Sequence, residues 1–292
     1  MRAPSDAFLS DARTARLVKD KLRFVLEYGV LAPGGHPWMI TVAENAIELR
    51  LGHRCQKHPH DGGHREALIG CGIGLAQLRL ALRQLGAVDS IILLPEESQP
   101  DVLARIYIDR IEEADPESYM LYQALYAPVS RTPGGMDRSF QQELAANAGF
   151  ERASIVFTAH DTLPPSGTAP TCGAPSLEGL VTKQTWMDPR AVSPSGLRTA
   201  AETARLTDPV GAVIATAGDA VSDWLAAGQA LARVALRARV EGFYTIATAA
   251  PRGARAPNGL YAHVAVRFGV PEGSPPADVL PPEASGIRRS PR

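Results

Sequence analysis

The sequence predicts an α+β protein that is internally duplicated, with two half-domains whose central helices pack on mixed β-sheets. Two similar helical patterns, residues 61–86 and 224–242, are each followed by an apolar, strand-like segment. When Gly228 is laid on Gly72, the two patterns align without a gap and Gly242 falls on Gly86. We interpret this match as a repeat of the same unit. The alternative is that two helices rich in Ala, Leu and Arg resemble each other through composition alone.

The first pattern predicts a helix with one continuous apolar face. The residues at helical spacing on this face are Leu68, Cys71, Leu75, Leu78, Leu82 and Leu85. Asp61 is a suitable N-cap, and Gly86 is suited to the position that follows a helix end. Gly72 and Gly74 remove side chains from the helix at a cost of about 1 kcal/mol each. Something must therefore approach the helix closely there, either another helix or a flat ligand.

The remaining elements follow from periodicity and turn residues. In the first half we expect a helix at 11–31, paired strands at 38–43 and 46–51, strands at 90–94 and 102–111, and a helix at 117–126. In the second half we expect a helix at 138–148 and strands at 154–159, 209–217, 243–247 and 261–268. Asp219 or Ser222 should cap the second repeat helix, and His263 should lie on the polar face of a half-buried strand.

Four segments are expected from these elements. They are a loose N-terminus at 1–10, the first half at 11–127, the second half at 128–270 and a Pro-rich tail at 271–292. Within the second half, the stretch 164–175 is rich in Pro, Gly, Ser and Thr and is expected to be a lid or a linker.

Composition limits the classes of function. The formal net charge is −1, which argues against nucleic-acid binding by bulk electrostatics. Three cysteines do not form a disulfide framework, and the N-terminus lacks the apolar core of a signal peptide. No apolar run approaches the length of a membrane span. We therefore expect a cytoplasmic protein with a small-molecule substrate, either a monomer with a pseudo-dimeric core or a homodimer.

Several short motifs together resemble a known family. They are Ala-Pro-Gly-Gly-His-Pro-Trp at 32–38, Asp-x-x-x-Arg-Glu at 61–66, Gly-Cys-Gly-x-Gly-Leu at 70–75, Ala-Thr-Ala-Gly-Asp at 215–219 and Ala-Gly-Gln-Ala-Leu-x-Arg-Val at 227–234. This order is similar to the nitroreductase family, in particular its single-chain, internally duplicated Acg-type branch. The resemblance implies a nitroreductase-like flavin fold and transfer of a hydride or two electrons through FMN to or from a small organic molecule. We expect an aromatic or heterocyclic substrate.

The resemblance also implies site residues. Those expected to line the flavin are Gly34, Gly35, His36 and Trp38. Arg131 and Thr132, with Arg13 or Arg16, would hold the phosphate, and His36 could donate a proton or simply cap the preceding helix. Gln229 could reach the cleft or be an ordinary helical glutamine. The glycine faces of the two repeat helices would admit the flat ring.

The flavin motifs are incomplete in this chain. The family's motif carries Ser after the first Pro and then Asn and Gln, whereas here Gly34, Gly35 and His36 lead directly to Pro37. A pair of arginines near the C-terminus is replaced by Ser-Pro at 274–275. We therefore expect weak, partial FMN binding. The alternative function is a flavin-free descendant that binds, or transforms without redox chemistry, a small molecule in the former flavin pocket.

Other patterns give weaker signals. The residues His53, Cys55, His58, His60 and His64 cluster at spacing that could hold a metal, but we favour a polar loop and expect no bound metal. The Gly72-Ile73-Gly74 sequence lies inside a helix, so it is not a dinucleotide fingerprint. Cys71 is interpreted as a small core residue.

Overall fold

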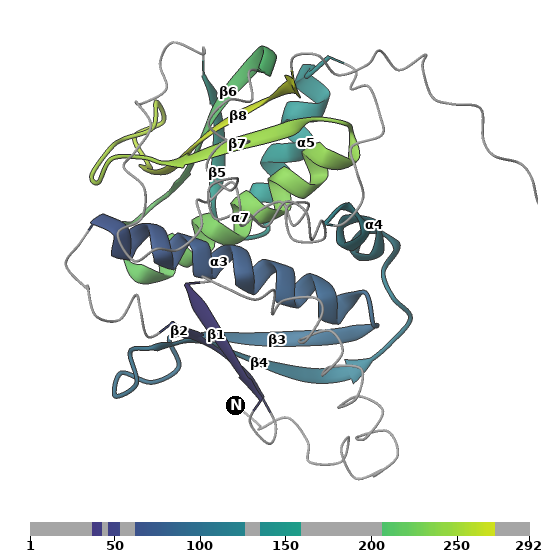
Figure 1. Ribbon diagram of the computed structural model, residues 1–292, viewed down its shortest axis with the longest axis vertical. Coiled ribbons are helices and arrows are strands. Elements are labelled where there is room, and N and C mark those ends of the chain that lie inside the picture. Colours follow the sequence, from purple (N-terminus) through teal and green to yellow (C-terminus); the bar gives the residue numbers. More distant parts are fainter. Residues whose placement is uncertain (1–36, 43–45, 53–61, 126–134, 159–205, 272–292) are drawn as a thin grey trace, which may run out of the picture.

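The computed structural model describes residues 37–42, 46–52, 62–125, 135–158 and 206–271. Within these residues, two four-stranded sheets enclose a pair of crossing helices (Figure 1). The coarse α+β prediction is confirmed. Among the helices of the described residues, we find none with both the length and the apolar character needed to cross a membrane.

The described elements of the first half lie close to their predicted positions, and the helix expected at 11–31 lies outside the described residues. The described elements are β1 (Trp38–Val42), β2 (Ile47–Leu51), α3 (Gly62–Arg83), β3 (Ala87–Leu93), β4 (Val102–Ile111) and α4 (Pro116–Ala124). β1 and β2 pair as the expected hairpin, with Trp38 opposite Leu51. The connection that follows α3 turns at Gly86, whose φ of 82° is the left-handed conformation that glycine adopts without strain. Pro116 begins α4 directly after Asp115, whose side chain accepts hydrogen bonds from two backbone N–H groups.

The described part of the second half contains two helices and four strands, and the stretch 164–175 lies outside the described residues. These helices and strands are α5 (Arg138–Gly149), β5 (Ser154–Thr158), β6 (Leu206–Thr216), α7 (Val221–Val240), β7 (Tyr244–Ala249) and β8 (Tyr261–Pro271). Asp137 caps α5 through its side chain. The cap of α7 differs from the prediction, because the N-cap residue is Ala220 and neither Asp219 nor Ser222. Asp223, one turn later, accepts a hydrogen bond from the Ala220 N–H and so satisfies that helix end.

The two sheets have the same strand order relative to their helices. The first sheet is ordered β1-β2-β4-β3 and the second β5-β6-β8-β7. In each half, one helix connects the second strand to the third. The expectation of mixed sheets is wrong for this part of the chain, because every strand pair among the described residues is antiparallel. The pairs β3–β4 and β7–β8 are consecutive strands, whereas α3 and α7 each connect two strands that are not neighbours in the sheet.

The helices α3 and α7 lie between the sheets and cross each other (Figure 1). Arg65 in the first turns of α3 faces Asp219, which lies two residues before α7, and near the C-terminal ends of the helices Leu80 and Leu236 share one apolar cluster. The helices therefore run in the same general direction. One apolar core includes Leu49 and Ile106 of the first sheet and also residues of the second, so its side chains join both sheets through the helix pair.

Candidate functional site

Gly72 and Gly228 mark the point where α3 and α7 touch. A Cβ added to Gly72 would lie 2.3 Å from the carbonyl oxygen of Leu225, and one added to Gly228 would lie 1.9 Å from that of Ile69. The absence of side chains thus allows backbone-to-backbone contact between the helices. Of the two neighbours that the sequence allowed at Gly72, another helix is the one observed.

Gly74 faces a different neighbour, the indole ring of Trp38 at the start of β1. A Cβ on Gly74 would lie 2.7 Å from the Cδ2 and Cε2 atoms of that ring. Trp38 is itself buried, with 5% of its surface exposed. The expectation that the glycine faces admit a flavin ring is therefore wrong at Gly72, Gly74 and Gly228, because protein atoms already fill these places.

Gln229, next to the crossing, belongs to a polar bridge between the halves. Its side-chain oxygen accepts a hydrogen bond of 3.0 Å from Arg79 of α3, and its side chain is buried. The Arg79 guanidinium also donates to Asp89 at 3.0 Å and to Glu151 at 3.1 Å. The side-chain oxygen of Gln229 thus holds α7 against α3.

A second buried bridge surrounds Arg65 in the first turns of α3. Its Nη1 donates to the Ala250 carbonyl at 2.7 Å, and its Nη2 donates to the Ala262 carbonyl at 2.9 Å. Nη2 also lies 2.8 Å from Nδ1 of His263, and Nε lies 3.7 Å from Oδ1 of Asp219. Arg65 is 7% exposed, so this charge of the first half is buried among groups of the second.

His263 is fully buried in β8, which corrects the expectation of a half-buried strand with this residue on its polar side. Its Nε2 lies 2.6 Å from the Thr216 hydroxyl and 3.2 Å from the Gly218 carbonyl. Burial lowers the pKa of His263, with the positive charge of Arg65 acting in the same direction and Asp219 opposing them. The ring is therefore neutral at neutral pH. The physical reason for the burial is that Arg65 and Thr216 satisfy both ring nitrogens inside the protein.

Two carboxylates accompany this bridge. Asp219 accepts a 2.6 Å hydrogen bond from the Trp224 indole N–H as well as facing Arg65. Burial raises the pKa of Glu66, the residue after Arg65, to about 7, against the attraction of that guanidinium. A carboxyl group that titrates near neutral pH is suited to proton transfer. In the described part of the chain, we find no cluster of three or more residues able to ligate a metal.

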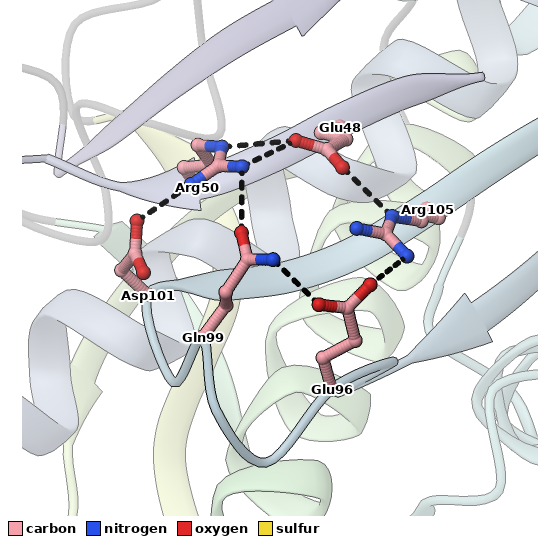
Figure 2. A network of polar contacts seen from close by, with 6 residues as sticks. All are labelled: Glu48, Arg50, Glu96, Gln99, Asp101 and Arg105. Carbon is pink, nitrogen blue, oxygen red and sulfur yellow. Dashed lines mark hydrogen bonds and ion pairs between the residues drawn. The ribbon is translucent and has the colours of Figure 1, made fainter. Parts of the chain in front are cut away.

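A separate polar network covers the outer face of the first sheet (Figure 2). It comprises Glu48, Arg50, Glu96, Gln99, Asp101 and Arg105. Glu48 lies at its centre, since its carboxylate accepts from Arg105 at 2.7 Å and from Arg50 at 2.7 and 2.9 Å. The hydrogen bonds from these arginines, that of Arg105 first, lower the pKa of Glu48. The network ties the β3–β4 connection to the sheet and leaves its charged groups paired with one another.

A cavity of about 300 Å³ lies beside the second sheet. Among the described residues that line it, Thr158 and Arg255 are polar and the others are apolar. The Arg255 guanidinium stacks 3.5 Å above the Tyr261 ring and donates to the Gly259 carbonyl. Neither Trp38 nor Gln229, the two described residues among those implied by the family resemblance, lines this cavity.

The predicted site residues divide into two groups. Those outside the described residues are Arg13, Arg16, Gly34, Gly35, His36, Arg131 and Thr132, as are His53, Cys55, His58 and His60 of the weighed metal loop. Trp38 and Gln229 are described, and each is buried in contacts within the chain. The grouping of Arg65, Glu66 and His263 was not predicted. Arg65 and Glu66 belong to the Asp-x-x-x-Arg-Glu motif at 61–66, but local sequence carries no signal that pairs them with a strand almost 200 residues later.

No protein-family model matches the chain, and no curated protein sequence is significantly similar to it.

Proposed function

We propose that this chain is a nitroreductase-like flavin oxidoreductase of the single-chain, duplicated type, acting on a small aromatic or heterocyclic molecule. The observation that carries the proposal is the matching order of strand, strand, helix, strand and strand in both halves. It is supported by the helix pair that touches at Gly72 and Gly228, the two glycines aligned in the sequence repeat. The residues that follow these helices, Gly86 and Gly242, both have positive φ, at 82° and 92°.

These matches favour duplication over chance similarity in composition, because composition does not specify strand order. On this proposal, a pseudo-twofold axis relates the halves, and one chain corresponds to the dimer of ordinary nitroreductases. The first half would be 11–127 and the second 128–270.

The described residues do not fit a flavin ring at the helix crossing. Gly72 and Gly228 contact each other's helix, Gly74 contacts Trp38, and Gln229 is hydrogen-bonded to Arg79. The proposal therefore assigns flavin binding to the positions whose sequence motifs suggest it: Gly34, Gly35, His36, Arg131 and Thr132. Because the usual Ser, Asn, Gln and paired arginines are missing, several charge-assisted or polar contacts are lost. Each is worth roughly 1.5–3 kcal/mol when a charged group takes part, so binding should be weak.

Titration of the purified protein with FMN, followed by flavin fluorescence, tests the proposal. We expect partial occupancy of the purified protein and saturation at high FMN concentration. Arg131→Ala should weaken FMN binding about 10- to 100-fold, since about 1.4 kcal/mol corresponds to a factor of ten. Arg138→Ala is the matched control, because it removes an exposed arginine at the start of α5 and should leave binding unchanged.

The filled glycine faces favour a second candidate, a flavin-free descendant that binds or transforms a small molecule without redox chemistry. Absence of FMN binding up to millimolar concentration would reject the flavin proposal and support this one. Equal FMN affinity of the Arg131→Ala variant and the wild type would show that Arg131 does not hold the phosphate.

A further inference from the structure

A buried histidine and a buried arginine connect the two halves. Arg65 of α3 and His263 of β8 are 198 residues apart in sequence, and the Arg65 Nη2 lies 2.8 Å from Nδ1 of the imidazole. His263 is 0% exposed and Arg65 is 7% exposed. Because both side chains are buried, bulk solvent cannot replace either partner, and the geometry of the contact restricts which protonation state the imidazole can have.

The hydrogen-bond directions follow from the chemistry of the partners. A guanidinium group only donates, so Nδ1 of His263 must accept from Arg65 and carries no proton. The proton of the neutral ring is then on Nε2, which donates to the Thr216 hydroxyl at 2.6 Å. That hydroxyl in turn donates to the Gly218 carbonyl at 2.9 Å. Both ring nitrogens are engaged, and a second proton could enter only at Nδ1.

We propose that the Arg65–His263 pair is an acid-sensitive latch between the halves, closed while the imidazole is neutral and opened when Nδ1 is protonated. Protonation replaces the acceptor with a donor that points at another donor. It also puts two positive charges at hydrogen-bond distance in a buried place. This proposal does not rest on flavin binding.

The surrounding charges favour the closed state at neutral pH. Asp219 Oδ1 lies 3.8 Å from Nδ1 of His263 and 3.7 Å from Nε of Arg65. If His263 were protonated, this single carboxylate would have to balance two positive charges. Asp223 of α7 attracts a charged His263 more weakly, and Glu66 and Arg252 act on the Arg65 charge with opposite signs. Burial and Arg65 together outweigh these attractions and hold the pKa of His263 below its usual range. The latch should therefore open as the pH falls below about 6.5, the usual pKa of histidine.

Opening the latch should release one local region. Besides His263, Arg65 holds the carbonyls of Ala250 and Ala262 at the two ends of the β7–β8 connection. When the guanidinium is displaced, the first turns of α3 lose their anchor on the second half. The crossing at Gly72 and Gly228, which depends on backbone contact, does not involve this proton.

The first test uses the wild-type protein labelled with ¹⁵N-histidine. At pH 7.5 the imidazole shifts of His263 should show a proton on Nε2 and none on Nδ1. Hydrogen exchange followed by mass spectrometry should then show that peptides covering 62–70 and 250–264 lose protection on acidification. After correction for intrinsic exchange, the opening constant should rise by up to about tenfold per pH unit below pH 6.5, as expected for uptake of one proton. A peptide covering 138–149 should not change.

The second test uses His263→Asn, whose side-chain oxygen can still accept from Arg65 but cannot take up a proton. The pH dependence of exchange at 62–70 should disappear, whereas His64→Gln, which changes a neighbouring histidine outside the pair, should retain it. The same acid dependence in His263→Asn and wild type would overturn the proposal. A proton on Nδ1 of wild-type His263 at pH 7.5 would also overturn it, and this result does not require any variant to fold.

Discussion

Gly72 and Gly228 face each other so closely that a methyl group on either would touch the backbone of the other. An added Cβ on Gly72 would lie 3.0 Å from the Cα of Gly228, and one on Gly228 would lie 2.9 Å from the Cα of Gly72. Each would also lie much closer to a carbonyl oxygen of the facing helix. The two helices are therefore fixed at a separation that only the smallest residue permits.

Alanine at either position should destabilise the protein. The added methyl group meets backbone atoms that cannot rotate away, so Gly72→Ala and Gly228→Ala should each lower the free energy of unfolding by about 1–3 kcal/mol. This loss occurs although alanine favours a helix by about 1 kcal/mol over glycine. Urea denaturation measures the difference. Gly149→Ala is the control, because nothing lies within 4 Å of its added Cβ, and it should be neutral or slightly stabilising.

Glu66→Gln should stabilise the protein above neutral pH. Since the folded-state pKa of Glu66 is raised from 4.5 to about 7, the folded protein keeps a proton that the unfolded chain has lost in this range. The contribution of Glu66 to the free energy of unfolding therefore decreases as the pH rises from 4.5 to 7. Above pH 7 the buried, ionised carboxylate destabilises the folded protein. Glutamine removes the charge, so the variant should be more stable by about 1–2 kcal/mol at pH 8 and should show little or no gain at pH 4.5.

Urea denaturation of this variant and the wild type at several pH values checks the prediction. The comparison uses the difference between the proteins, because His263 changes wild-type stability with the opposite sign in an overlapping range. The exposed Glu113→Gln serves as control. A difference between Glu66→Gln and wild type that is constant from pH 4.5 to 8 would be inconsistent with the raised pKa.

Glu48→Gln should destabilise the first sheet. Glutamine keeps the shape of the side chain but leaves Arg50 and Arg105 without the carboxylate that both contact, at a cost of about 1–2 kcal/mol at pH 7. Because the folded-state pKa of Glu48 is lowered, this contribution is complete above pH 4.5 and disappears as the pH falls through the lowered value. Denaturation curves at pH 7 and in acid measure the change. Glu97→Gln changes an exposed residue in the β3–β4 connection and should have no effect on stability. Equal losses of stability in both variants would contradict the role of Glu48 in the network.

The elements that could be predicted from sequence are those set by local periodicity. Residues 102–111 alternate in a run bounded by turns, and the observed strand β4 has the same limits. The helix expected at 138–148 is observed as α5, which ends one residue later at Gly149. Its start is set by a local signal, because the Asp137 side chain caps it. The type of sheet was not predicted correctly, because strand direction depends on connections rather than on the residues within a strand.

The candidate site could be predicted much less well. The glycines of α3 indicated a close approach, but a pattern within one helix cannot identify its neighbour as α7 or as Trp38. His263 lies in an alternating segment that is typical of a strand with one polar face. Its burial depends on Arg65, which is contributed by the other half of the chain. Sequence patterns describe a residue's own element, whereas these groups acquire their chemistry from contacts between elements.

The distance along the chain between the two crossing glycines has a consequence for synthesis on the ribosome. Gly228 is added to the chain 156 residues after Gly72. At roughly 5–20 residues per second, this delay lasts about 10–30 s. During that time α3 can pack on the first sheet with one face, but its opposite face, which will contact α7, has no partner. The apolar face of α3 in the nascent first half therefore stays exposed until α7 is made and completes the core.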